Sequence, residues 1–109
     1  MVLPFEIIER KTIEALAELI RRQKGGCLTF TCKHLARLAG LDTKPVTLTL
    51  IREVIEELRR RGWLEIYKIS SHGIKYKITC KSPAWKILKN TVPTSLNELL
   101  MLAEALATI

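Results

Sequence analysis

The stretch Leu35-Ala36-Arg37-Leu38-Ala39-Gly40-Leu41 decides the fold of this chain. A small side chain at Ala36 allows two helices to approach closely, and the glycine four positions later permits a tight turn between them. The sequence therefore predicts a short helix over residues 32–39 that ends at Gly40. Apolar residues at helical spacing predict a longer helix over residues 45–61 on the other side of the turn.

The remaining elements follow from hydrophobic periodicity and from turn-forming residues. They are a helix over residues 5–24, a strand over 27–31, strands over 63–70 and 74–81 joined at residues 70–73, a connector over 82–90 with a helical turn around Trp85, and a last helix that runs to about residue 108. Ser95 and Glu98 have the spacing of a capping box at the start of that last helix. Together these elements predict an α+β domain.

The hairpin carries much of the excess positive charge of the chain. The whole sequence has 18 basic and 11 acidic residues, which gives a net charge of +7. Between residues 66 and 90 there are six lysines and no acidic residue. In the second strand of the hairpin, apolar side chains alternate with Lys75, Lys77 and Lys81, so that one face of the strand is basic. This charge predicts attraction to polyanions, with nucleic acid first and an anionic membrane surface second.

The segment Leu58-Arg59-Arg60-Arg61-Gly62-Trp63-Leu64 leads directly from the longer helix into the hairpin. With this exit, the turn at Gly40 and the order helix, strand, helix, helix, hairpin, residues 5–81 resemble the winged-helix family of DNA-binding domains found in archaeal and bacterial transcription regulators. The resemblance implies a winged helix-turn-helix with a three-helix core, a short strand plus a β-hairpin wing, and an extra C-terminal helix. It implies a DNA-binding domain over residues 1–90 and a C-terminal apolar helix over residues 91–109.

The resemblance also implies roles for individual residues. The helix over residues 45–61 would lie in the major groove, where the guanidinium of Arg52 matches the edge of guanine. Residues 71–73 would form the tip of the wing, and the lysines of the wing over residues 68–81 would contact phosphates. The residues expected to contact duplex DNA are Lys44, Thr47, Thr49, Arg52, Arg60, Lys68, Ser71, His72, Lys75, Lys77 and Lys81.

Other interpretations of the same residues stay open. Glu53, Glu56 and Glu57 lie on the expected recognition helix, and phosphates repel carboxylates. The arginines at 59–61 equally act as cations at a helix C-terminus, and a row of lysines equally protects an exposed strand. A second class of function is therefore a winged-helix module for protein interaction in a replication, transcription or chromatin assembly. A third is an architectural DNA binder without sequence preference.

The last helix is apolar almost all round, and a helix of this kind must be buried. It can pack on the first helix of the same chain, or it can pair with the same helix of a second copy. Of these two arrangements we expect the homodimer. The residues expected at the dimer interface are Leu96, Leu99, Leu100, Leu102, Ala103 and Leu106.

The cysteines leave one disulfide open and predict no metal site. Cys27, Cys32 and His34 have a spacing that matches no zinc site. In the winged-helix family the first strand pairs antiparallel with the last strand of the wing, so the resemblance implies that Cys27 and Cys80 are neighbours. We hypothesise a disulfide between them, with free thiols as the alternative. No cofactor and no small-molecule ligand are inferred.

Length and composition set the remaining expectations. With 109 residues the chain suits one domain, and no apolar run has the length of a bilayer span. The first residues lack the features of a signal peptide, so we expect a cytoplasmic, nucleoid-associated protein. Few amides among many charged side chains suggest a thermophilic, archaeal source. No catalytic arrangement stands out, and the expected function is a homodimeric transcription regulator that reads duplex DNA, not an enzyme.

Overall fold

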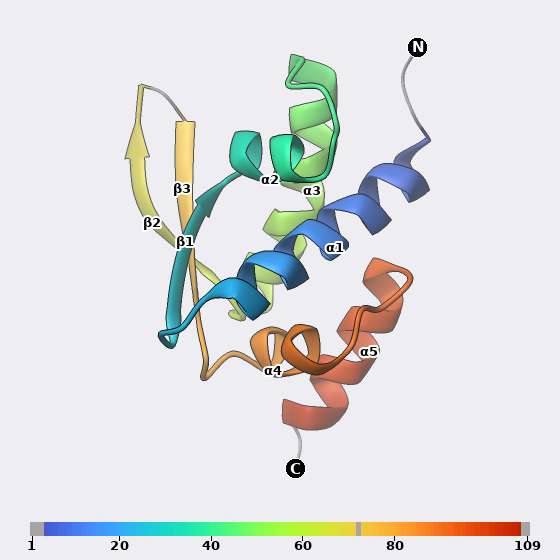
Figure 1. Cartoon of the computed structure of the whole chain (residues 1–109), viewed down its shortest axis with the longest axis vertical. Helices are drawn as coiled ribbons and strands as arrows, with labels where there is room; N and C mark the ends of the chain where they lie inside the picture. Colours follow the sequence, from blue (N-terminus) through green and yellow to red (C-terminus); the bar gives the residue numbers. More distant parts are fainter. Residues whose placement is uncertain (1–3, 72, 108–109) are drawn as a thin grey trace.

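The computed structural model describes residues 4–71 and 73–107, so the expected wing-tip residue His72 lies outside the described residues. Along this part of the chain the elements are α1 (Phe5–Arg22), β1 (Cys27–Thr31), α2 (Cys32–Leu38), α3 (Pro45–Arg60), β2 (Glu65–Ser70), β3 (Gly73–Thr79), α4 (Pro83–Asn90) and α5 (Leu96–Ala107) (Figure 1). The described residues thus form an α+β domain with five helices and one three-stranded antiparallel sheet. The predicted class and the predicted order of elements up to the hairpin are confirmed.

The sheet has the strand order β1-β3-β2, and both strand pairs are antiparallel. β2 and β3 form the predicted hairpin, with an irregular register between Ile66 and Lys68. β1 pairs with β3, with Cys27 opposite Thr79. The expected pairing of the first strand with the last strand of the hairpin is therefore confirmed.

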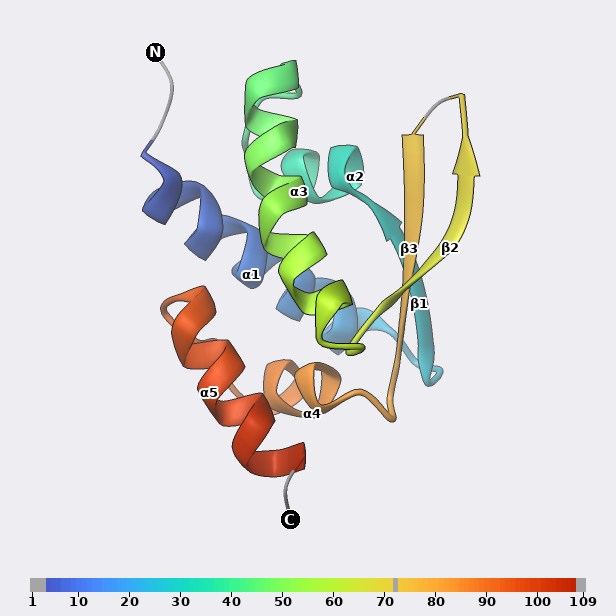
Figure 2. The same ribbon diagram turned by 180° about the vertical axis from the view of Figure 1, so that it is seen from behind.

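The hydrophobic core lies on one side of this sheet. α1, α2 and α3 lie beside the sheet, whereas α4 and α5 lie near the end where β3 leaves it (Figures 1 and 2). Leu28 and Phe30 of β1 and Tyr76 and Ile78 of β3 are buried in the core. The rings of Phe30 and Tyr76 stack with their centroids 5.9 Å apart. The alternation predicted for β3 therefore directs its apolar side chains toward the helices and its lysines away from them.

The junction between α2 and α3 has the geometry that its sequence predicts. Ala36 is fully buried, and its carbonyl oxygen accepts a hydrogen bond of 2.8 Å from the amide of Leu41. Between them Gly40 has a φ of 75°, in the left-handed region, and its amide donates to the carbonyl of Arg37. These two hydrogen bonds are the pair that ends a helix in a Schellman motif. The turn thus satisfies the last carbonyls of α2 and redirects the chain into α3.

The C-terminal part differs from the prediction in two respects. The expected connector is a complete helix, α4, because Trp85 and Leu88 bury their side chains in the core. α5 then packs on α4 and α1 of the same chain, with Leu99 and Ala103 fully buried. Leu100 is 8% exposed, so three of the six residues expected at a dimer interface belong to the core of a single copy. They are buried within the chain because α4 provides an apolar surface that the sequence analysis did not anticipate.

Polar contacts hold both ends of α5. The Glu9 carboxylate of α1 accepts a hydrogen bond from the Leu96 amide at the start of α5. The predicted capping pair forms on one side, where the Ser95 hydroxyl accepts from the Glu98 amide at 3.2 Å. Further along α5, Glu104 pairs with Arg61 at the end of α3. No helix in the part of the chain that the structure describes is long and apolar enough to span a membrane.

The left-handed backbone at Gly40 generates a test of the fold. Replacing Gly40 by Ala should destabilise the domain by about 1–2 kcal/mol, because an L-residue is strained at a positive φ. At this chain length each 1 kcal/mol lowers Tm by about 4–8 °C in thermal unfolding. No neighbouring atom lies near the added methyl group, so steric overlap does not contribute. Gly25→Ala is the matched control, since Gly25 has no positive φ, and an equal loss in both variants would contradict the assignment.

Candidate functional site

A cleft of about 360 Å³ opens between the start of α2, the exposed side of α3 and the end of β3 next to the hairpin turn. Lys33 of α2 and Arg52 of α3 line this cleft, and no acidic residue in the described part of the chain does. Its other lining residues include Leu48, Thr49 and Tyr76. The cleft thus combines two cations with the hydroxyl groups of Thr31, Thr49 and Tyr76 and with apolar side chains.

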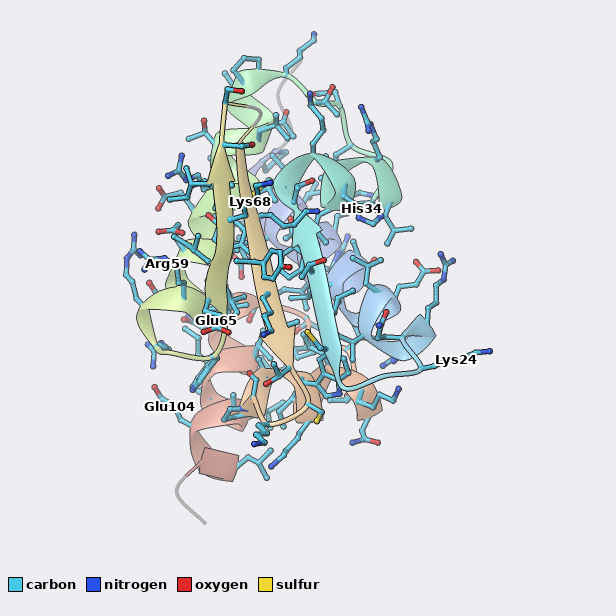
Figure 3. The ribbon with its side chains drawn as sticks, turned by 90° about the vertical axis from the view of Figure 1, so that its left-hand side faces the viewer. Lys24, His34, Arg59, Glu65, Lys68 and Glu104 are labelled. Carbon is cyan, nitrogen blue, oxygen red and sulfur yellow. The ribbon has the colours of Figure 1, made fainter. Side chains whose placement is uncertain are left out.

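A second hollow, of about 200 Å³, adjoins this cleft, because Gly73 and Ile74 line both. Lys68 of β2 and Lys75 of β3 line the second hollow and are directly opposite each other in the sheet. Figure 3 shows Lys68 at the end of the sheet nearest α2. Like charges at directly opposed positions destabilise a strand pair, so this arrangement favours an anion beside the two lysines.

The two hollows share Gly73 and Ile74 at the edge of the sheet, with the first on the side toward α3 and the lysines of the second on the side away from it. We call the two hollows together the basic surface and define it by Lys33, Arg52, Lys68 and Lys75. Thr31 also lines both hollows, and its hydroxyl caps α2 by accepting a hydrogen bond of 3.1 Å from the His34 amide. Sequence reasoning named three of these four cations and missed Lys33. The sequence signal that could have identified Lys33 is its position in the first turn of α2, the helix that precedes the turn at Gly40.

The side of α3 that faces the cleft differs from the expectation at its first turn. Thr47, expected to contact DNA, is only 6% exposed, whereas Val46, expected in the apolar stripe, is 55% exposed. A hydrogen bond from the Thr47 side chain is the main reason that the pKa of Asp42, at the entrance to α3, is lowered. Thr47 is therefore unavailable for groove contact. Thr49 remains exposed, and its hydroxyl donates to the Pro45 carbonyl at 2.8 Å.

The other expected contact residues are dispersed. Lys44 and Ser71 are exposed, at the start of α3 and at the hairpin turn. Arg60 pairs with Glu57 one turn earlier on α3. The remaining two lysines, Lys77 and Lys81, line a different cleft at the far end of the sheet.

Glu56 of α3 is a structural group and not a repulsive one. Its carboxylate accepts a hydrogen bond of 2.8 Å from the Tyr76 hydroxyl and hydrogen bonds from both Nε and a terminal nitrogen of Arg59. The Arg59 hydrogen bonds are the main reason that the pKa of Glu56 is lowered, and burial is the main reason that the pKa of Tyr76 is raised. The Arg59 side chain thus neutralises a carboxylate that we expected to repel phosphates. Glu53 remains exposed on α3.

The hypothesised disulfide between Cys27 and Cys80 is absent, and all three cysteines are free thiols. The strand register places Thr79, not Cys80, opposite Cys27. The Cys80 amide donates to the Gly26 carbonyl at 2.8 Å, and the Cys80 sulfur lies where a side chain at Gly26 would be. Cys80 is therefore held against Gly26 rather than against Cys27.

No group of three or more His, Cys, Asp and Glu side chains in the described residues could hold a metal ion. The described site is thus a surface with four cations and two hollows on a small α+β domain. Comparison of the chain with protein-family models, with curated proteins and with solved structures finds no match. The assignment of a function therefore depends on the geometry and charge described above.

Burial of Cys32 in the cleft generates a prediction about thiol reactivity. Burial raises the pKa of Cys32 to about 11, whereas Cys27 and Cys80 are exposed. Because the thiolate is the reactive form, two thiols of the folded protein should be alkylated quickly near neutral pH and the third slowly. Mass spectrometry of peptides from a time course would assign the slow site. In denaturant all three thiols should react. Fewer than three reactive thiols would support the disulfide between Cys27 and Cys80.

The contacts of Glu56 generate a prediction about pH. Because its folded pKa lies below the ordinary value of 4.5, these contacts stabilise the fold fully above that value and progressively less as pH falls through the folded pKa. Glu56→Gln should therefore lower Tm at neutral pH, and its deficit relative to the unsubstituted chain should shrink below pH 4.5. Thermal unfolding of both proteins across this range measures the difference. A Tm difference between the two proteins that stays constant with pH would contradict the lowered pKa of Glu56.

Proposed function

We propose that this chain is a winged-helix protein that binds duplex DNA through the basic surface. The observation that carries the proposal is the direct opposition of Lys68 and Lys75 beside the cleft that Arg52 and Lys33 line. A fold selected for stability alone gains nothing from this repulsion, whereas a phosphate near both lysines makes it favourable. The net charge of +7 supports the same partner.

The order of elements supports the winged-helix assignment. The glycine turn after α2 leads into α3, α3 leads into the hairpin, and the hairpin pairs with β1. In such a domain α3 enters the major groove and the hairpin lies over the adjoining backbone. Arg52 and Thr49 are the exposed groups on α3 that would reach base edges, and Lys68 and Lys75 would contact phosphates.

The proposal does not depend on a dimer. Because α5 buries Leu99, Leu100 and Ala103 within its own chain, Met101 and Leu102 are the large apolar side chains that its described residues still expose to a second copy. This is a small apolar area for a stable interface. A single copy already presents all four cations of the basic surface, so one chain is enough for the binding that we propose.

Exposed apolar side chains favour the second candidate function, a protein-interaction module. Ile66, Tyr67 and Ile69 of β2 are 37%, 59% and 68% exposed, and Val46 of α3 is exposed as well. These side chains offer a protein partner apolar contacts that a DNA backbone does not need. The four cations still favour nucleic acid, because no acidic residue in the described part of the chain lines either hollow.

Salt titration of duplex binding tests the proposal. Fluorescence anisotropy should show affinity falling steeply with salt, and the double substitution Lys68→Ala with Lys75→Ala should reduce the slope of log K against log salt by about 1 per lysine. Because it relieves their mutual repulsion, this double substitution should not lower Tm. Lys24→Ala is the control, since Lys24 is exposed in the loop between α1 and β1, away from the basic surface (Figure 3).

Selection from random duplexes then separates the alternatives. If α3 reads bases, sequencing of the tightest-bound fraction should return a defined site, and Arg52→Ala should weaken binding to that site by about tenfold or more while sparing random DNA. Enrichment without a defined site would indicate architectural binding. Absence of duplex binding at low salt, or equal losses in the Lys24 control, would overturn the proposal in favour of the protein-interaction module.

A further inference from the structure

A second polar cleft, of about 230 Å³, lies at the opposite end of the sheet from the basic surface. It is located where α3 leads into β2 and where β3 leads into α4. Its polar lining residues are Glu65, Lys77, Thr79, Lys81 and Ser82. We call it the lower cleft, and the basic surface does not account for it.

Ser82 is the feature of the lower cleft that needs an explanation. The residue is only 8% exposed, and its hydroxyl oxygen is buried without a hydrogen-bond partner in the described part of the chain. Among the described side chains it is the one buried polar group in this state. Buried hydroxyl groups in folded proteins are nearly always hydrogen-bonded, so an unpartnered one beside a cleft points to a missing ligand.

Ser82 is also the N-cap residue of α4, yet its side chain makes no capping hydrogen bond. α4 starts with Pro83, which has no amide hydrogen, and no acidic side chain occupies its first turn. Within the part of the chain that the structure describes, no side chain caps the amides of Ala84 and Trp85. The positive end of the helix dipole and these amides favour an anion at this position.

We propose that the lower cleft binds a phosphate-type anion at the N-terminus of α4. The Ser82 and Thr79 hydroxyls would donate hydrogen bonds to it, and Lys77 and Lys81 would supply positive charge. The Lys77 ammonium lies 3.9 Å from the Glu65 carboxylate, a loose ion pair that leaves it able to contact an anion. Along β3, Lys75 of the basic surface and Lys77 of the lower cleft are about 7 Å apart, whereas Gly73 and Thr79, which line the far sides of the two sites, are about 20 Å apart. One phosphate group therefore cannot fill both sites.

Two sources could supply this anion, a free phosphate group or the backbone of a duplex that extends past the basic surface. The first experiment uses inorganic phosphate and the full chain. An NMR titration at constant ionic strength, balanced with chloride, should give saturable shifts of the Ala84 and Trp85 amides. Shifts that rise without saturation, or that appear equally at lysines elsewhere, would overturn the proposal.

Substitutions then test the assigned groups. Ser82→Ala should weaken phosphate binding by about tenfold, since a hydrogen bond to a charged group is lost. The Ser82 hydroxyl has no hydrogen-bond partner in the described residues, so its removal breaks no contact. In phosphate-free buffer the variant should therefore unfold at the same Tm as the unsubstituted chain, or at a higher one. Lys81→Gln should weaken phosphate binding too. Because Lys81 is exposed, this substitution should leave the fold intact. Glu65→Gln should strengthen binding by releasing Lys77.

Lys86→Gln is the matched control, because Lys86 is an exposed lysine of α4 that is not part of the lower cleft. If Lys86→Gln weakened phosphate binding as much as Lys81→Gln, the proposed site would be wrong.

Duplex binding by the Ser82→Ala variant identifies the source of the anion. Unchanged duplex affinity assigns the lower cleft to free phosphate, and reduced affinity assigns it to a backbone phosphate. Since the phosphate titration needs no DNA, its result is independent of the duplex-binding proposal.

Discussion

The hydrogen bond from the Tyr76 hydroxyl to the Glu56 carboxylate joins the hairpin to α3, and the geometry of the basic surface depends on it. Tyr76 is fully buried and stacks on Phe30, so one side chain holds β1, β3 and α3 in a fixed relation. Arg59 holds the Glu56 carboxylate from the other side. Because the cleft is the space between α3 and β3, these contacts also set its width.

Charges at the two ends of the sheet are arranged differently. At the lower end Lys77 has Glu65 nearby, and Glu56 and Glu57 on α3 are paired with arginines. At the end nearest the hairpin turn Lys68 and Lys75 oppose each other, and no carboxylate in the described residues lines the hollow beside them. Exposed charges without partners cost little in water but attract polyanions over several ångströms. Within the hollows of the described residues, Lys68 and Lys75 therefore have no carboxylate beside them, whereas Lys77 has Glu65.

The helices of this domain begin and end in different ways. α2 and α3 both end in a glycine with positive φ, at Gly40 and Gly62, and each turn orients the element that follows. The starts of α2 and α5 are closed by protein groups, namely the Thr31 hydroxyl and the Glu9 carboxylate. The N-cap residues of α1, α3 and α4 make no side-chain capping hydrogen bond. α4 is distinguished by Ser82, whose buried hydroxyl has no partner in the described residues and lies beside a cleft with two lysines. The first amides of α4 thus lie beside the cleft for which we propose an anion.

The antiparallel pairing of β1 with β3 was implied by the resemblance to the winged-helix family. The sequence by itself determined the class of the domain and the order of its elements up to the hairpin. These features depend on local periodicity and on single turn residues such as Gly40, whose conformational demands are visible in a short window of sequence. Only the tertiary structure decided how α4 and α5 are buried, because the apolar face of one is covered by the other. It also decided that Thr47 turns inward while Val46 is exposed, and that Lys33 joins Arg52 at the cleft. Such outcomes depend on which surfaces meet across the fold, and no spacing along the chain encodes them.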